Sequence, residues 1–469
     1  MPNWFATVAL VLWPLVALGL YFTRPLYQAT IWTILGAQYL LPVGALIKFA
    51  PVIPVFDKSS IPNLCILAGC VMTARRSMQI LHRFGIPEVL ILMYLSSPIL
   101  TSLNNGDAIV LGDMTLPGVG LYDALSNVEL SFVTLIPFFI GRQFLGRSDA
   151  ILEIFRTLVI AGALYSIPML FEVRFSPQLH YWFYGYYPSE FLQSVREGGY
   201  RPAVFMGHGL LAAMFAMMAT VSAVTLARLR DPILKIPPVG VTIYLSIILM
   251  LCKSLGALLY AVTLAPLVRF TKPQFQTRVA LALVIFSLLY PMLRSVDFVP
   301  TTMMVQVAQS VSDDRAGSLQ FRFVNEDQLL TRAFERPAFG WGRYGRSRVY
   351  SEEGRDLSVT DGRWVITIGQ FGIFGFIAEF GLLSIGVLRA WRGIGLAKSK
   401  SDKILLSALS LIVATNILDL LPNSGLTPWT WLLAGTLLGR SERLDALAVR
   451  PTQVFVTKSD RTTAAGKCF

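Results

Sequence analysis

Charged residues are scarce in this chain of 469 residues: they make up 14% of it, hydrophobic residues make up 54%, and the mean hydropathy is +0.59. An average soluble domain carries roughly 25% charged residues. A soluble chain of this length would form two or three domains with polar surfaces, and the charge present is too little to coat them. The composition therefore excludes a water-soluble enzyme, a disordered chain and a disulfide-stapled secreted protein. It predicts a polytopic membrane protein.

Cysteine and histidine are almost absent as well. The four cysteines show no metal-ligand spacing, and we interpret the three in apolar segments, Cys65, Cys70 and Cys252, as small core residues. Three histidines argue against a multi-histidine metal site, and neither a metal nor a cofactor is expected. No basic segment precedes the apolar stretch at 5–21 and no clear cleavage site follows it, which predicts a retained helix rather than a signal peptide.

Long apolar runs dominate the chain. A spanning helix needs about 20 mostly apolar residues, and no internal repeat is visible. The predicted fold class is an all-α polytopic integral membrane protein with about 12 to 13 transmembrane helices. Its expected parts are ten helices in 1–293, a large loop in 294–363, the last helices in 364–439 and a basic tail in 440–469. The candidate helices are 4–22, 28–48, 53–74, 86–103, 121–141, 151–171, 204–226, 236–251, 254–270, 278–293, 364–388, 404–420 and 425–439.

The net charge of +12 is distributed unevenly. Clusters of Lys and Arg follow every second helix, whereas the short loop 104–120 contains two aspartates and no basic residue. Because cytoplasmic loops concentrate Lys and Arg, we expect the C-terminus in the cytoplasm and segments 104–120, 172–203 and 294–363 outside it. The helix count then places the N-terminus outside. This topology accounts for the basic excess, so no nucleic-acid partner is expected.

Two of the outer segments are rich in side chains that could bind a ligand. Segment 294–363 holds ten basic and ten acidic residues together with several aromatic residues and glycines, which predicts a folded cap. Segment 172–203 is rich in aromatic residues. These form either an interfacial belt or a surface that stacks on sugar rings.

Four basic residues of the outer face are candidates for anion binding. Arg201 precedes Pro202 where the seventh helix is expected to open, Lys253 lies at the outer turn between two apolar runs, and Arg322 and Arg343 lie in the large loop. If they converge, they form a cationic cleft suited to a lipid diphosphate, because arginine binds phosphate with two hydrogen bonds. Each residue alone is equally well a solvated loop charge or an ion-pair partner.

Several short motifs follow one another in a fixed order between about residues 200 and 390. This order resembles the shared core of the O-antigen ligase and O-antigen polymerase superfamily. That core has a Ser-Arg-Gly-Ala helix start, an Arg before a Pro-x-x-Gly-x-Gly turn, and a His-Asn before a Glu-x-Gly-x-x-Gly helix. The corresponding positions here are Lys253-Ser-Leu-Gly-Ala257, Arg322, Pro337-Ala-Phe-Gly-Trp-Gly342, Asp361-Gly362 and Gln370-Phe-Gly-Ile-Phe-Gly375. The chain departs from the pattern at Leu255, where the family usually has Arg, at Glu326, where a Trp often stands, and at Asp361-Gly362.

The resemblance implies a GT-C-like integral-membrane glycosyltransferase of the bacterial inner membrane with its active site facing the periplasm. Such an enzyme takes a glycan from undecaprenyl diphosphate and transfers it to an acceptor glycan or to lipid A-core, among membrane lipids. A chain-length regulator or an export protein is a further candidate partner. The chemistry implied is metal-independent: arginines stabilise the leaving diphosphate, and a general base assists the acceptor hydroxyl. Arg201 and Arg322 are the first candidates for the diphosphate site, followed by Lys253 and Arg343.

Two residues compete for the role of the base. Asp361 stands where the family has His, and it either acts as the base or pairs with Arg363. His208, seven residues after Arg201, has the more suitable ordinary pKa but is equally well a structural histidine.

Three other functions fit a chain of this type. A lipid-linked oligosaccharide flippase or transporter would have charges along an inner cavity and often repeat symmetry. A peptidoglycan-polymerising membrane protein would share the many helices and the large outer loop. A scaffold of a secretion complex would not need the outer arginines.

Overall fold

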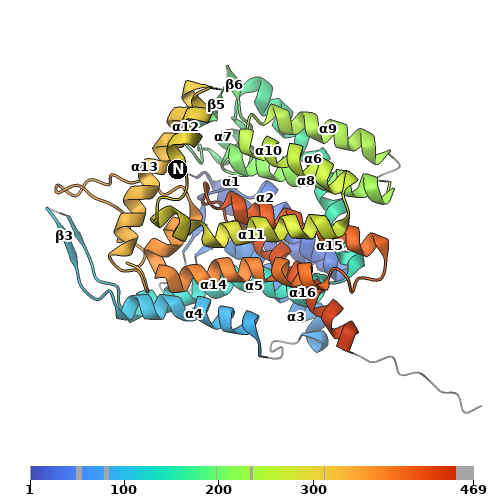
Figure 1. The fold of residues 1–469 in the computed structure, drawn as a ribbon, viewed down its shortest axis with the longest axis horizontal. Helices are drawn as coiled ribbons and strands as arrows, with labels where there is room; N and C mark the ends of the chain where they lie inside the picture. Colours follow the sequence, from blue (N-terminus) through green and yellow to red (C-terminus); the bar gives the residue numbers. More distant parts are fainter. Residues whose placement is uncertain are drawn as a thin grey trace, which may run out of the picture.

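The computed structural model describes residues 2–48, 55–78, 84–112, 114–196, 198–232, 236–310 and 312–449. Its long helices lie side by side with their axes roughly horizontal in Figure 1. Two further helices, α12 (Thr301–Gln309) and α13 (Asp313–Phe334), lie across one end of this bundle. We call α12, α13 and the irregular chain from 335 to 362 the cap.

Each apolar segment expected to be helical contains a helix. Eight of the described helices are long and apolar enough to cross a membrane, namely α1, α4, α5 with the π-turn that follows it, α6, α8, α11, α14 and α15. The all-α, multi-pass membrane character expected from the sequence is therefore confirmed. The helices of the bundle are α1 (Trp4–Thr23), α2 (Leu26–Leu40), α3 (Ser60–Ala74), α4 (Ile86–Leu103), α5 (Leu121–Ile140), α6 (Ser148–Phe175), α8 (Gly209–Leu229), α9 (Pro238–Leu251), α10 (Leu255–Phe270), α11 (Pro273–Ser295), α14 (Arg363–Gly393), α15 (Lys400–Asp419) and α16 (Pro428–Val449).

Several short elements connect these helices. They include a π-helix directly after α5 and three two-stranded antiparallel hairpins, β1 with β2, β3 with β4 and β5 with β6. Their bounds are β1 (Leu46–Ile47), β2 (Phe56–Asp57), β3 (Ile109–Leu111), β4 (Met114–Leu116), α7 (Leu179–Tyr184), β5 (Val195–Arg196), β6 (Gly199–Tyr200), the π-helix (Gly141–Leu145) and the 3₁₀ turns (Arg75–Ser77 and Phe191–Ser194).

Several helix boundaries differ from the sequence-based expectation. The helix expected over 53–74 begins at Ser60, and the one expected over 425–439 runs from Pro428 to Val449, so the first residues of the expected basic tail are helical. Two further differences have a local cause. The helix expected over 28–48 ends at Leu40, because Pro42 disfavours helical geometry in the residue before it. The helix expected over 204–226 begins only at Gly209, where the ring Nδ1 of His208 accepts a hydrogen bond from the backbone N–H of Leu210 at 3.1 Å and caps the first turn. Arg201 therefore lies in the loop before α8 and does not open the helix.

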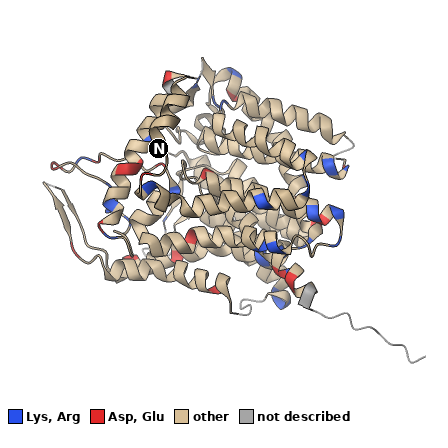
Figure 2. Ribbon diagram, in the orientation of Figure 1, with Lys and Arg blue, Asp and Glu red and all other residues tan. Residues whose placement is uncertain are grey.

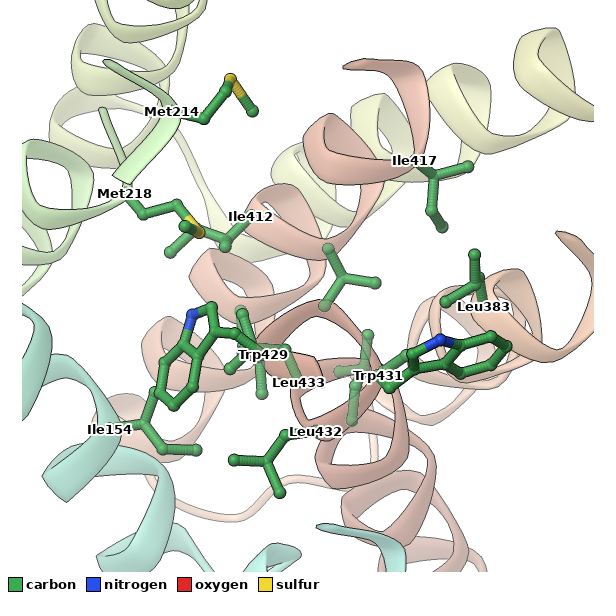
Figure 3. Packing of buried hydrophobic residues seen from close by; sticks show 14 of the residues in the cluster. Ile154, Met214, Met218, Leu383, Ile412, Ile417, Trp429, Trp431, Leu432 and Leu433 are labelled. Carbon is green, nitrogen blue, oxygen red and sulfur yellow. The ribbon is translucent and has the colours of Figure 1, made fainter. Parts of the chain in front are cut away.

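The core lies between α6, α8, α14, α15 and α16. Figure 3 shows Trp429 and Trp431 at the start of α16 projecting to opposite sides, the first toward Ile154 and the second toward Leu383. Both indole rings are fully buried, and large aromatic side chains contribute much of the packing energy in such cores. Cys65 and Cys70 lie in α3, and Cys252 follows α9; all three are free thiols, of which Cys70 and Cys252 are buried as expected and Cys65 is half-buried, and Cys468 lies outside the described residues.

Small residues allow α16 to approach α5 closely. A Cβ added at Gly435 would lie 2.1 Å from the carbonyl oxygen of Phe138, and one at Gly439 would lie 2.0 Å from that of Arg142. The two glycines are four residues apart, the spacing that lets helix backbones touch in membranes. The crossing fixes the end of the bundle that lies far from the cap.

The two ends of the bundle differ in charge. In Figure 2, Lys and Arg gather at the end opposite the cap, whereas the cap end carries acidic and basic residues together. This is the asymmetry that the alternating basic clusters of the sequence indicate. By the positive-inside rule, we expect the basic end to lie in the cytoplasm.

Candidate functional site

The Pro337–Gly342 turn and the glycine-rich part of α14 form one structural unit. Gly372 has φ +67° and ψ −171°, which breaks the helix in its first third. The backbone N–H groups of Trp341 and Gly342 donate to the carbonyl groups of Gly369 and Gln370 at 2.8 and 2.9 Å, and the N–H of Ile373 donates to Pro337 at 2.8 Å. The turn thus supplies hydrogen bonds that the broken helix lacks. Broken helices are tolerated at membrane depth where the backbone is buried in protein or lines a cavity.

Only glycine fits at the two contact points of this unit. Gly340 and Gly342 have φ +69° and +88°, so the tight turn expected there is present. A Cβ at Gly340 would lie 2.6 Å from the carbonyl carbon of Gln370, and one at Gly372 would lie 2.3 Å from the carbonyl oxygen of Ala338. The spacing of the two motifs therefore reflects a close backbone contact.

Arg343 follows this turn directly. Its guanidinium lies 5.6 Å from the centre of the Phe371 ring, and its Nε has no hydrogen-bond partner among the described residues. Burial lowers the pKa of Arg343, and the nearby charge of Arg363 lowers it further. The neighbouring carboxylate, Glu379, is already engaged: Arg363 donates two hydrogen bonds to it at 2.7 and 2.6 Å, and Thr367 donates a third at 2.9 Å.

Arg201 and Lys253 meet through backbone groups. Arg201 is 9% exposed, and its Nη2 donates to the carbonyl oxygen of Lys253 at 3.0 Å. Lys253 itself adopts φ +49° in the turn between α9 and α10, and its Nζ donates to the carbonyl oxygen of Arg196 in β5 at 2.9 Å. The turn before α10 is thereby attached to the hairpin that precedes Arg201.

A buried carboxylate holds the loop that carries Arg201 and His208. Glu172, near the end of α6, accepts hydrogen bonds from the backbone N–H groups of Leu179 at 3.2 Å, Ala203 at 2.9 Å and Val204 at 2.7 Å. Sequence reasoning missed this residue. A lone carboxylate at the outer end of an apolar helix was the signal that could have identified it.

His208 has both ring nitrogens engaged. Its Nδ1 caps α8, so the neutral ring carries its proton on Nε2, which lies 3.2 Å from Oε1 of Gln193. Burial lowers the pKa of His208 to about 4, and the charges of Arg201, Arg322 and Arg196 contribute. The ring is therefore neutral near pH 7, and taking up a proton on Nδ1 would break the cap. This geometry favours the structural role over that of the base.

Arg322 and Asp361 form an ion pair within the cap. Nε of Arg322 lies 3.6 Å from Oδ2 of Asp361, and their side chains are 31% and 38% exposed. The expected alternative that Asp361 pairs with Arg363 is wrong, because Arg363 binds Glu379. Burial raises the pKa of Asp361, and Arg322 opposes that shift. Asp361 is thus an accessible carboxylate beside a cation.

The backbone at 361–363 is attached to the end of α15. The N–H of Arg363 donates to the carbonyl oxygens of Leu420 at 2.9 Å and Asn423 at 3.1 Å. Asp419, which accepts a hydrogen bond from the amide of Asn423 at 3.0 Å, lies in the same turn. A second carboxylate therefore lies beside the segment that carries Asp361.

Five of the six residues expected to form the site lie in one neighbourhood, and Arg343 lies in the adjoining Arg363–Glu379 group. Arg201, Lys253 and His208 come from the loops before α8 and α10, whereas Arg322 and Asp361 belong to the cap. In the part of the chain that the structure describes, no three His, Cys, Asp or Glu side chains are grouped to hold a metal ion. Neither protein-family models nor curated protein sequences give a match to this chain.

Proposed function

We propose that this protein is a glycosyltransferase of the bacterial inner membrane that polymerises or ligates oligosaccharide repeats carried on undecaprenyl diphosphate at the periplasmic face. The observation that carries the proposal is the Arg322–Asp361 pair in the cap, with Arg201 and Lys253 beside it at the same end of a multi-pass bundle. Cations that hold a diphosphate and a carboxylate that receives a proton are the two elements this transfer needs.

The proposed transfer uses the cations to stabilise the leaving group. The acceptor hydroxyl oxygen forms a bond to the anomeric carbon, and the bond from that carbon to the diphosphate oxygen breaks with its electron pair on the diphosphate. Arg322 and Arg201 neutralise the negative charge that develops there. Asp361 receives the proton of the hydroxyl, since its carboxylate is accessible and its pKa is raised by burial.

Arg343 strengthens the case for an anionic ligand. It is a half-buried arginine without an ion pair among the described residues, its Nε is buried without a hydrogen-bond partner, and it is adjacent to the glycine-lined turn. Buried charges are normally paired, so an anionic substrate group is a natural partner for it. We also propose that the transmembrane helices have the GT-C-like architecture that the sequence resemblance implies.

The central test replaces Arg322 in a strain that lacks the chromosomal copy. Arg322→Lys retains the charge but loses the planar fork, so surface-glycan assembly should fall substantially. Arg322→Ala should lower it on the order of tenfold to a hundredfold, because a charge-assisted hydrogen bond contributes roughly 1.5–3 kcal/mol. Arg348→Lys is the matched control, since Arg348 also pairs with a carboxylate of the cap, Asp356, outside the cluster.

Gel analysis of surface and lipid-linked glycans separates the possible outcomes. Lost long chains with intact lipid-linked repeats would indicate a polymerase, whereas accumulated long lipid-linked chains would indicate a ligase. Normal glycan assembly by a stably expressed Arg322→Ala protein would refute the proposal. Comparing Asp361→Asn with His208→Gln then tests the base, and only the first should abolish transfer.

A further inference from the structure

A second group of arginines lies at the basic end of the bundle, far from the cap. There the start of α6 and the last turns of α16 enclose an open cavity of about 560 Å³. Three arginines, Arg147, Arg440 and Arg443, line it together with the apolar side chains of Ala446 and Leu447. The proposed transfer site uses none of these residues.

The fold forces these arginines together. A Cβ added at Gly146 would lie 2.6 Å from the carbonyl carbon of Gly439, so the backbones of these two glycines are in contact. Each glycine directly precedes an arginine, Arg147 in one segment and Arg440 in the other. Arg443 follows Arg440 by three residues and therefore lies on the same face of α16. The contact between the two glycine backbones brings the arginines together despite the repulsion between their like charges.

The carboxylates nearby compensate this charge only in part. Arg147 pairs with Asp149 at 3.0 Å in an exposed contact, and Arg440 pairs with the buried Asp402. Arg443 donates to the carbonyl oxygen of Gln143 at 2.7 Å but has no carboxylate partner among the described residues. Burial lowers the pKa of Arg443, and the charges of Arg147 and Arg440 add to this effect. The three guanidiniums are therefore close enough to repel one another.

We propose that this cavity binds the phosphate head group of an anionic membrane phospholipid. Arginine provides planar donors for phosphate, and the cavity opens beside helices of a membrane protein, where basic pockets recognise anionic lipids. Leu447, which is 61% exposed at the rim, offers an apolar contact for the glycerol and acyl region. The chain after α16 would be repelled as an occupant, because residues 450–469 contain four basic residues and one acidic residue.

Lipid retention by the purified, delipidated full chain tests this proposal. Native mass spectrometry should show phosphatidylglycerol retained by the wild type and phosphatidylcholine lost. Arg443→Gln should weaken phosphatidylglycerol binding by about tenfold, since one charge-assisted hydrogen bond is removed. Arg392→Gln is the control, because Arg392 is an exposed arginine at the end of α14, outside the cavity, and should leave retention unchanged.

A second variant keeps the test independent of folding. Arg147 is 67% exposed, so Arg147→Gln should fold normally and weaken lipid retention by a few fold. Wild-type retention of phosphatidylglycerol by both Arg443→Gln and Arg147→Gln would overturn the proposal. It would also be overturned if millimolar inorganic phosphate stabilised the protein against heat as much as phosphatidylglycerol does, because the site would then take a free anion. Neither outcome depends on whether the protein transfers glycans.

Discussion

Arg142 is buried and Arg343 is half-buried; the two arginines lie at opposite ends of the bundle, and their surroundings differ. The side chain of Arg142 is 4% exposed and lies 2.7 Å from both Glu88 of α4 and Glu442 of α16. Arg389 of α14 also reaches Glu442, at 2.9 Å. Arg343 has no such pair among the described residues. Arg142 thus has two carboxylate partners at the basic end, whereas Arg343 in the cap has none among the described residues.

The difference separates two uses of the same side chain. A buried arginine with two carboxylates holds helices together, and its removal leaves buried negative charges unpaired. A half-buried arginine without a carboxylate partner contributes little to the fold and is available to an anionic ligand. The comparison predicts that replacing Arg142 changes stability, whereas replacing Arg343 changes activity.

Arg142→Leu should have the largest effect on stability. It leaves Glu88 and Glu442 facing each other without their shared cation, and breaking a buried pair in this way costs about 3–5 kcal/mol. Denaturant unfolding of the detergent-solubilised protein measures the loss. Arg147→Leu is the control, since an exposed pair such as Arg147–Asp149 contributes only about 0–1 kcal/mol. A loss at Arg142 no larger than at Arg147 would contradict the structural role.

Gly372→Ala should come next, and it tests the cap end. The new Cβ would lie 2.3 Å from the carbonyl oxygen of Ala338, and an alanine at φ +67° is strained by roughly 1–3 kcal/mol. We expect a loss of about 2–3 kcal/mol in unfolding free energy together with reduced glycan assembly. Gly256→Ala is the matched control, because a Cβ there meets nothing within 4 Å. An equally stable Gly372→Ala protein would mean that the turn and α14 are not tightly joined.

The sequence was sufficient to predict the helices and the glycine motifs, but not which side chains form ion pairs with one another. Long apolar runs predict helices because membrane burial requires about 20 apolar residues in succession. Gly340 and Gly372 could be recognised in the sequence because each belongs to a glycine motif. The backbones of the two motifs are in close contact in the structure, and such a contact requires glycine. The sequence did not show which residues form ion pairs: Asp361 pairs with Arg322, 39 positions away, rather than with Arg363, two positions away. Contacts such as Arg142 with Glu442, 300 residues apart, depend on the tertiary fold alone.

Acidification should destabilise the cap end by a smaller amount. The folded-state pKa of His208 is about 4, below its ordinary value of 6.5, so the unfolded chain binds more protons between these two values. Its contribution to stability is complete above about pH 6.5 and is lost as the pH falls toward 4, with a loss of about 2 kcal/mol at pH 5.

The measurement is the unfolding free energy at pH 7.5 and pH 5 for the wild type and His208→Gln. Glu326, whose pKa is raised to about 7 by burial, acts in the opposite direction, so only the difference between the two proteins isolates the histidine. An identical pH dependence in both proteins would show that His208 is not buried as described.

Arg343→Leu should change stability least, by less than about 1 kcal/mol in either direction, because replacing a partly desolvated charge that has no carboxylate partner with an apolar residue is often neutral or stabilising. The leucine would pack against Phe371, and Glu379 would keep its pair with Arg363. Glycan assembly should nevertheless fall on the order of tenfold if Arg343 contributes one charge-assisted contact to the substrate. Arg363→Leu provides the contrast, since it strands the buried Glu379 and should cost about 3–5 kcal/mol. If Arg343→Leu destabilised the protein as strongly as Arg363→Leu, Arg343 would belong to the fold rather than to the site.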